Sequence, residues 1–176
     1  MSWSIVNIVA TGDLKQRVDL IDIANLPHTI YDYEIYGGRV AYLKTPEMKG
    51  KVTIFPSGKL ISIGTKTQTD SQFDLEHTVK MLSESELIKP VKVNAIIRNI
   101  VVLHQLILSG LEEIADSLGG IYEPDKFPGI IYKPKEIGCT YLIFNSGKVI
   151  ISGIKSFEMI KTSVEYIESL IKDIML

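Results

Sequence analysis

The segment IFPSGKLISIGTK, residues 54–66, returns as IFNSGKVIISGIK at residues 143–155. Eight of the 13 aligned positions are identical, and the two copies lie 89 residues apart. The tripeptide Asn-Ile-Val precedes each copy, at residues 7–9 and 99–101. Self-similarity at a fixed period is typical of repeated structural units. We therefore interpret the chain as two diverged copies of one unit, residues 1–88 and 89–176, that together form one domain.

Hydrophobic periodicity predicts the elements of each copy. Alternating apolar residues on both sides of Ser57-Gly58 and of Ser146-Gly147 indicate two strands joined by a tight hairpin. The last segment carries an apolar stripe at helical spacing, formed by Ile160, Val164, Ile167, Ile171 and Ile174. Each unit is predicted to run strand, helix, four strands, helix. This is an α+β arrangement in which helices cover one face of an antiparallel sheet.

The predicted sheet has two largely apolar faces. One parity of the hairpin strands holds Lys51, Thr53, Phe55, Ile61 and Ile63 in the first copy, and Thr140, Leu142, Phe144, Ile150 and Ser152 in the second. The opposite parity, which includes Val52, Ile54 and Leu60, is the natural side for the helices. Because the helices suffice for one face only, we expect the other face to bind a partner.

Composition narrows the class of protein. The 176 residues are 45% hydrophobic, and 19 basic against 21 acidic side chains give a net charge of −2. A nucleic-acid-binding role therefore requires the basic residues to be concentrated on one face. The single Cys139 excludes an intramolecular disulfide, and neither a leader nor a membrane-spanning apolar run is visible. We expect a soluble intracellular protein.

Signs of catalysis or of a bound cofactor are weak. His28, His77 and His104 have no metal-ligand spacing to Cys or carboxylate residues. The Gly58-Lys59 pair lacks the other residues of a phosphate-binding loop and joins two strands. We therefore expect no metal, no cofactor and no enzymatic activity.

At these motifs the chain resembles the TATA-box-binding protein family over nearly its whole length. The most specific signs are the doubled Phe-x-Ser-Gly-Lys hairpin, the repeated Asn-Ile-Val, and YEPDKFPGIIY at residues 122–132. The resemblance implies a pseudo-twofold saddle, with a curved antiparallel sheet and helices on its convex face. The first motif lies close to Met1, which looks more archaeal than nuclear. A cytoplasmic, nucleoid-associated location is implied, or a nuclear one in a eukaryote.

The resemblance also implies a function, that of a general transcription initiation factor. The family is itself a standard example of proteins that read the minor groove with a β-sheet, insert apolar wedges between base steps and bend the DNA. By resemblance the wedge pairs are Tyr36 with Phe55 and Phe127 with Phe144. Asn7 and Asn99 match the asparagines that offer amide groups to A·T-rich minor-groove edges. Further implied DNA contacts are apolar at Val9, Ile61, Val101, Leu142 and Ile150, and phosphate contacts at Ser57, Lys59, Lys66, Lys133, Ser146, Lys148 and Lys155.

Several positions depart from the family pattern in the first copy. Tyr36 replaces the expected phenylalanine, and Gly37 replaces the proline that the second copy keeps as Pro128. Ile63 stands where the family has a hydroxyl residue, which Ser152 retains, and Thr53 replaces the leucine kept as Leu142. We expect the first half to kink DNA less firmly and to discriminate bases less well, by about 1 kcal/mol. This predicts a diverged paralogue or lineage variant with relaxed or altered TATA preference.

The resemblance names protein partners as well. Glu123 and Asp125 match acidic positions through which the family engages transcription factor B, and with it RNA polymerase. The first long helix is acidic, with Asp70, Asp74, Glu76, Glu84 and Glu86 against Lys80, and so lacks the basic surface of eukaryotic members. A second copy of the chain is a further candidate partner, because two such faces could cover each other without DNA.

Two other functions stay open at this point. The chain could be a related interaction protein that binds transcription factors with weak or lost TATA binding. It could also be an accessory module or small-ligand grip in nucleic-acid metabolism, although no catalytic domain is visible in it.

Overall fold

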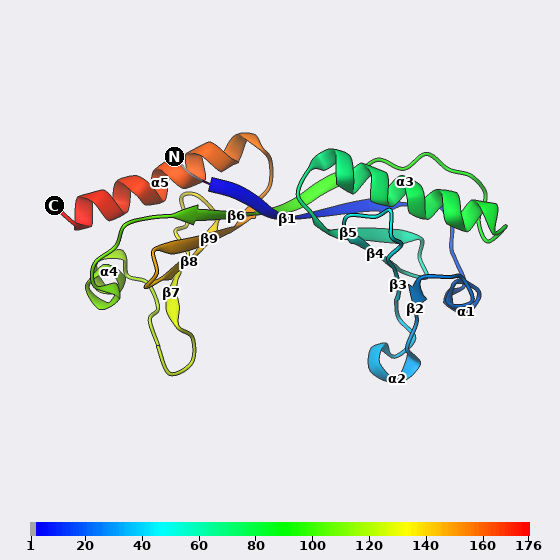
Figure 1. Ribbon diagram of the computed structural model, residues 1–176, viewed down its shortest axis with the longest axis horizontal. Coiled ribbons are helices and arrows are strands. Elements are labelled where there is room, and N and C mark those ends of the chain that lie inside the picture. The colour runs from blue at the N-terminus through cyan, green and yellow to red at the C-terminus, as the bar shows by residue number, and fades with distance from the viewer. Residues whose placement is uncertain (1–2) are drawn as a thin grey trace. The chain divides into compact units, whose positions relative to one another are not determined.

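The computed structural model of the chain describes residues 3–176, except for the side chain of Tyr36. Its contacts divide the chain into two compact units. The first unit is Asn7–Arg98, and the second unit is Asn99–Leu176 together with the start of the chain up to Val6. In each unit, antiparallel strands carry helices on one side (Figure 1).

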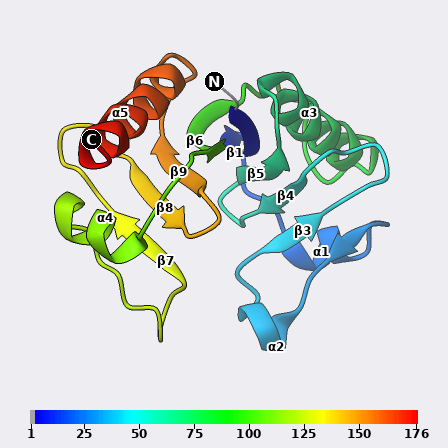
Figure 2. The same cartoon turned by 60° about the vertical axis from the view of Figure 1, so that its left-hand side comes forward.

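The first unit is built on five strands. Along the chain they follow as β1 (Trp3–Asp13), α1 (Leu20–Ala24), β2 (Thr29–Ile30), α2 (Tyr33–Tyr36), β3 (Ala41–Leu43), β4 (Lys51–Ile54), β5 (Lys59–Thr65) and α3 (Gln68–Glu84). The strands pair antiparallel in the order β2-β3-β4-β5-β1. Helix α3 lies along β4 and β5 in both views (Figures 1 and 2).

The second unit repeats this order with fewer elements. It contains β6 (Ile96–Gln105), α4 (Leu111–Leu118), β7 (Gly129–Tyr132), β8 (Thr140–Phe144), β9 (Lys148–Ile154) and α5 (Glu158–Ile174). Its strands pair antiparallel in the order β6-β9-β8-β7. Helix α5 packs against β9.

The predicted run of four strands after the first helix needs correction in both units. In the first unit the short helix α2 interrupts it, because the Asp32 carboxylate accepts a hydrogen bond from the Ile35 N–H at 2.8 Å and Gly37 ends the turn in the left-handed region. In the second unit only three strands form. The corresponding segment contains Pro124 and Pro128, which lack N–H donors, and pairs only through the single bridge between Ile121 and Ile131.

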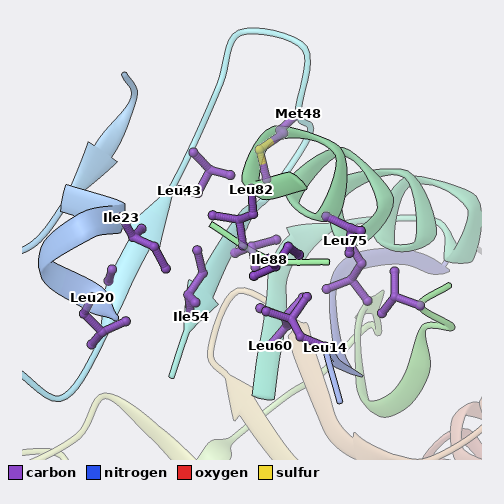
Figure 3. Packing of buried hydrophobic residues seen from close by; sticks show 14 residues of the cluster. Leu14, Leu20, Ile23, Leu43, Met48, Ile54, Leu60, Leu75, Leu82 and Ile88 are labelled. Carbon is purple, nitrogen blue, oxygen red and sulfur yellow. The ribbon is translucent and has the colours of Figure 1, made fainter. Parts of the chain in front are cut away.

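The core of the first unit lies between the strands and α3. Val52, Ile54 and Leu60, the residues predicted to face the helices, are fully buried. Leu75 and Leu82 of α3 belong to the same buried cluster, in which Figure 3 labels them together with Ile54 and Leu60. The predicted parity of β4 and β5 is therefore confirmed.

The second unit has its own core beneath α5. Ile160, Val164, Ile167 and Ile171 are buried along one side of this helix, as the apolar stripe predicts. Tyr141 is the largest fully buried side chain, and its hydroxyl donates a hydrogen bond to the Ser163 carbonyl at 2.9 Å. Burial raises the pKa of this hydroxyl, so it remains a donor. Among residues 3–176, no helix is long and apolar enough to cross a membrane.

The two Ser-Gly hairpins are anchored in the same way. The Gly58 carbonyl accepts from the Leu14 N–H at 2.9 Å, and the Gly147 carbonyl accepts from the Leu106 N–H at 2.8 Å. Both glycines have positive φ angles, +86° and +80°, and a Cβ at either would come within 2.0 Å of a backbone oxygen. Only glycine fits here, which explains why a glycine follows the serine in both hairpins.

Asp74, which the sequence predicts on the surface of α3, is buried and holds a loop in place. Asp74 is fully buried, and its carboxylate accepts hydrogen bonds from the backbone N–H groups of Lys49 and Gly50 at 3.1 and 2.7 Å. It thereby fixes the loop between β3 and β4 against α3. The prediction that Asp74 belongs to the acidic surface of α3 is therefore wrong, because its position on the helix directs its side chain inward toward these two donors.

Candidate nucleic-acid interface

Each unit leaves one side of its strands without a helix, and we call this side the open face. In the first unit it carries Val9, Thr11, Tyr42, Lys51, Thr53, Phe55, Ile61 and Ile63, all partly or fully exposed. In the second unit it carries Val101, Leu103, Ile131, Thr140, Leu142, Phe144, Ile150 and Ser152, all half-buried. Both lists contain the residues that the sequence predicts on one parity.

Strand pairing aligns a row of side chains across each open face. In the first unit Ile61 of β5 pairs with Thr53 on one side and with Thr11 on the other. In the second unit Ile150 of β9 pairs with Leu142 and with Leu103. The two rows occupy equivalent positions. Ile61 is flanked by two threonine side chains, which carry hydroxyls, whereas Ile150 is flanked by two leucine side chains.

The side-chain oxygen of each of the two asparagines is held by a backbone N–H group. The Asn7 side-chain oxygen accepts a hydrogen bond from the Gly64 N–H at 2.8 Å, and the Asn99 oxygen accepts from the Gly153 N–H at 2.7 Å. Both contacts lie where the strand register shifts. This bond orients the amide, and among the described residues no hydrogen bond involves either side-chain NH₂ group, so each remains a donor for an external acceptor.

Phe127 and Phe144 lie together at the edge of the second unit. Their ring centroids are 5.6 Å apart with an interplanar angle of 59°. Gly129 pairs with Phe144, and a Cβ at Gly129 would lie 3.1 Å from atoms of both rings. The glycine thus leaves room for two aromatic rings that are both partly accessible.

The corresponding pair in the first unit is described only in part. Phe55 directly follows β4 and is half-buried on the open face. The backbone of Tyr36 ends α2, but its side chain lies outside the described residues. The pairing of Tyr36 with Phe55 therefore stays a prediction.

The polar residues expected at phosphates are exposed in both hairpins, but their lysines differ. The Ser57 and Ser146 hydroxyls accept long hydrogen bonds, at 3.4 and 3.5 Å, from the N–H groups two residues on. Lys59 forms an ion pair with Asp13, and this hydrogen bond holds the pKa of the Asp13 carboxyl well below its usual range. Lys148 has no carboxylate within 4.0 Å among residues 3–176. The side chains of Lys66, Lys133 and Lys155 are also exposed.

A hollow of about 560 Å³ opens beside Phe55 and Ile61 in the first unit. Besides Lys59 it is lined by three cations, Lys15, Lys92 and Arg98. The Arg98 Nε–H donates a hydrogen bond to the Thr11 hydroxyl at 2.8 Å. Sequence reasoning missed these three residues. Lys15 and Lys92 lie in connections without periodicity, and the position of Arg98 in β6 beside Thr11 depends on an arrangement of strands that sequence alone does not give.

The acidic residues expected to meet a protein partner lie in the loop between α4 and β7. Glu123 and Asp125 are both exposed. The Glu123 carboxylate is 2.9 Å from the Lys126 ammonium, an ion pair within the same turn.

Comparison with known proteins bears on the identity of this fold. The family model described as "Transcription factor TFIID (or TATA-binding protein, TBP)" matches residues 2–85 and 92–174. The TATA-box-binding protein of Cenarchaeum symbiosum is 37% identical over 164 residues, covering 90% of this chain and 88% of that protein. The TATA-box-binding protein of Methanothermobacter thermautotrophicus is also 37% identical, covering 92% and 90%.

A solved structure agrees with these sequence matches. The structure of Methanococcus jannaschii TBP superposes with a TM-score of 0.87 at 30% identity, covering 98% of this chain and 99% of that one. The match includes both repeats and is not confined to the hairpin motifs. The chain therefore belongs to the TATA-box-binding protein family.

Proposed function

We propose that the protein is a general transcription initiation factor that binds A·T-rich promoter DNA through the minor groove. The observation that carries this is the pair of fixed amides, Asn7 on Gly64 and Asn99 on Gly153. Each presents NH₂ donors beside an apolar open face, and A·T pairs present only acceptors in the minor groove. The two groups are chemically complementary.

DNA bending is proposed for the aromatic residues. Phe127 and Phe144 are accessible and adjacent, which suits insertion between two base steps. Phe55 with Tyr36 would act at the other end. Unstacking a step costs a few kcal/mol, which the contacts of the open faces would offset.

Phosphate contacts would come from exposed cations of both units. Lys66, Lys133, Lys148 and Lys155 are exposed, and Lys15, Lys92 and Arg98 surround the hollow beside Lys59. The grouping of Lys15, Lys59, Lys92 and Arg98 around the hollow is compatible with a net charge of −2. We propose that these groups follow the DNA backbone and position the open faces.

The protein partners are proposed from the family. Glu123 and Asp125 would bind transcription factor B, which would bring RNA polymerase to the promoter in an intracellular, DNA-associated complex. The residues of the exposed loop between α4 and β7 are available for such contacts.

Fluorescence anisotropy of an A·T-rich TATA duplex against a G·C-rich duplex tests the proposal, with a salt titration and with transcription factor B present or absent. We expect saturable, A·T-preferring binding that Phe127→Ala or Phe144→Ala abolishes. Equal weak binding of both duplexes, unaffected by these substitutions, would contradict it. Retained binding of transcription factor B would then identify an interaction protein that no longer reads TATA sites.

A further inference from the structure

The row of side chains at Ile61 differs in chemistry from the equivalent row at Ile150. Thr53 and Thr11 flank Ile61, whereas Leu142 and Leu103 flank Ile150. Thr53 lies two residues from Phe55 on the same strand face, and Leu142 lies two residues from Phe144. Each side chain therefore occupies the same position relative to its aromatic wedge.

These two side chains respond differently to a guanine. In the minor groove a G·C pair differs from an A·T pair by the guanine N2 amino group, which is a donor. Against Leu142 this amino group would be buried without an acceptor, which is unfavourable. Against Thr53 it would meet a hydroxyl oxygen that can accept its hydrogen bond.

Of the two threonines in the row, Thr53 is the one whose hydroxyl is not already held by a protein group. The Thr11 oxygen already accepts from Arg98 Nε at 2.8 Å. Within the described part of the chain, no hydrogen bond involves the Thr53 hydroxyl. Strand pairing with Tyr42 on one side and Ile61 on the other holds Thr53 on the open face.

We propose that Thr53 makes the half-site read by the first unit tolerant of one purine carrying a minor-groove amino group, whereas Leu142 makes the equivalent position of the other half-site exclude it. The inference rests on the proposed minor-groove binding and adds to it the class of DNA site: an asymmetric site that is A·T-only in one half.

The test varies the amino group alone. In an A·T-rich duplex, each adenine is replaced in turn by 2,6-diaminopurine, which still pairs with thymine but adds the minor-groove amino group. A second series compares G·C with inosine·C pairs, which removes it. For each protein variant, the affinity for each substituted duplex is divided by the affinity of the same variant for the parent duplex.

For wild-type protein, the amino group is expected to lower the relative affinity by no more than about 3-fold at one position of the half-site read by the first unit. At the equivalent position of the other half-site it should lower the relative affinity by about 10-fold or more, because a lost hydrogen bond of about 1.4 kcal/mol corresponds to a tenfold change. Thr53→Val keeps the shape of the side chain and removes the hydroxyl. It should increase the loss of relative affinity in the half-site read by the first unit to about 10-fold. Thr53→Ser should keep the tolerance. Leu142→Thr should relieve the penalty in the other half.

Two outcomes would overturn the inference, and they are distinguishable. If A·T preference is present but wild-type and Thr53→Val protein penalise every amino group equally, Thr53 does not read the base and the proposed function stands. If the parent duplex is not preferred over a G·C-rich one, the proposed function fails and this inference fails with it.

Discussion

Asp13 and Lys59 form an ion pair at the hairpin end of the first open face, and Lys148, the lysine equivalent to Lys59, has no such partner among residues 3–176. The position equivalent to Asp13 is Gln105, whose side-chain NH₂ group donates hydrogen bonds to the Leu106 and Ser146 carbonyls at 3.1 and 2.9 Å. Lys148 is therefore left to an external anion, whereas Lys59 is partly neutralised. The two hairpins should contribute unequally to DNA affinity.

Asp13→Asn should raise the affinity for a TATA duplex several-fold at low salt, because it releases both Lys59 and Lys15, which pair with Asp13, for phosphates. The slope of log affinity against log salt should steepen by about 0.9 for each lysine that gains a phosphate contact. Anisotropy titrations from low to moderate salt measure both. Glu165→Gln removes a carboxylate paired with Lys161 at 3.7 Å on α5 and serves as the control for net charge. Equal effects of the two substitutions would show that only net charge matters.

Asn99→Asp should reduce TATA binding by at least about tenfold while leaving the fold intact. The carboxylate can still accept from the Gly153 N–H, but the NH₂ donors are lost and a negative charge faces the groove. Affinity is measured by anisotropy and folding by thermal denaturation. Asn25→Asp makes the same charge change just after α1, away from the open face. Binding by Asn99→Asp protein that matches the Asn25→Asp control would argue against a base contact by the amide.

Gly129→Ala should decrease the DNA bend more than it decreases affinity. The added methyl group would lie 2.9 Å from the Ile143 carbonyl oxygen and 3.1 Å from atoms of Phe127 and Phe144, so the rings must move. Energy transfer between dyes at the two ends of a TATA duplex reports the bend. An unchanged bend angle, with a normal unfolding midpoint, would mean that the arrangement of these rings is not needed for kinking.

Asp74→Ala should lower the free energy of unfolding by about 2 kcal/mol or more, because two backbone N–H groups lose their acceptor in a buried site. Urea denaturation followed by circular dichroism measures it. Glu84→Ala removes an exposed carboxylate at the end of the same helix and should change stability by no more than about 0.5 kcal/mol. Similar losses in both variants would place the effect in helix electrostatics instead of the Lys49–Gly50 loop.

The repeated hairpin allowed much of this fold to be predicted from sequence. Period-2 alternation around Ser57-Gly58 identified which side of β4 and β5 packs on α3, and the apolar stripe located α5. Helix α2 was not predicted, because a single capped turn at Asp32 has no periodicity. The inward direction of Asp74 could not be predicted either, since its partners are backbone groups 24 and 25 residues away in a loop.

The candidate site was predicted less completely than the fold. Family resemblance supplied Asn7 and Asn99, but nothing in the sequence says that Gly64 and Gly153 occupy their oxygens. Thr11 alternates with Val9 along the sequence, yet its place opposite Ile61 depends on strand register, which sequence alone does not determine. The cations of the hollow come from three separate segments and meet only in the folded unit.

The hydrogen bond from a glycine N–H to each asparagine also affects which base pairs the protein can exclude. An asparagine free to rotate could turn its carbonyl toward a guanine amino group and so accept a G·C pair. With the oxygen held by Gly64 or Gly153, the side chain cannot turn over, and a guanine at that place would set one donor against another. The backbone N–H of a glycine, which never touches the base, would thus keep the base pair read by each asparagine free of G·C.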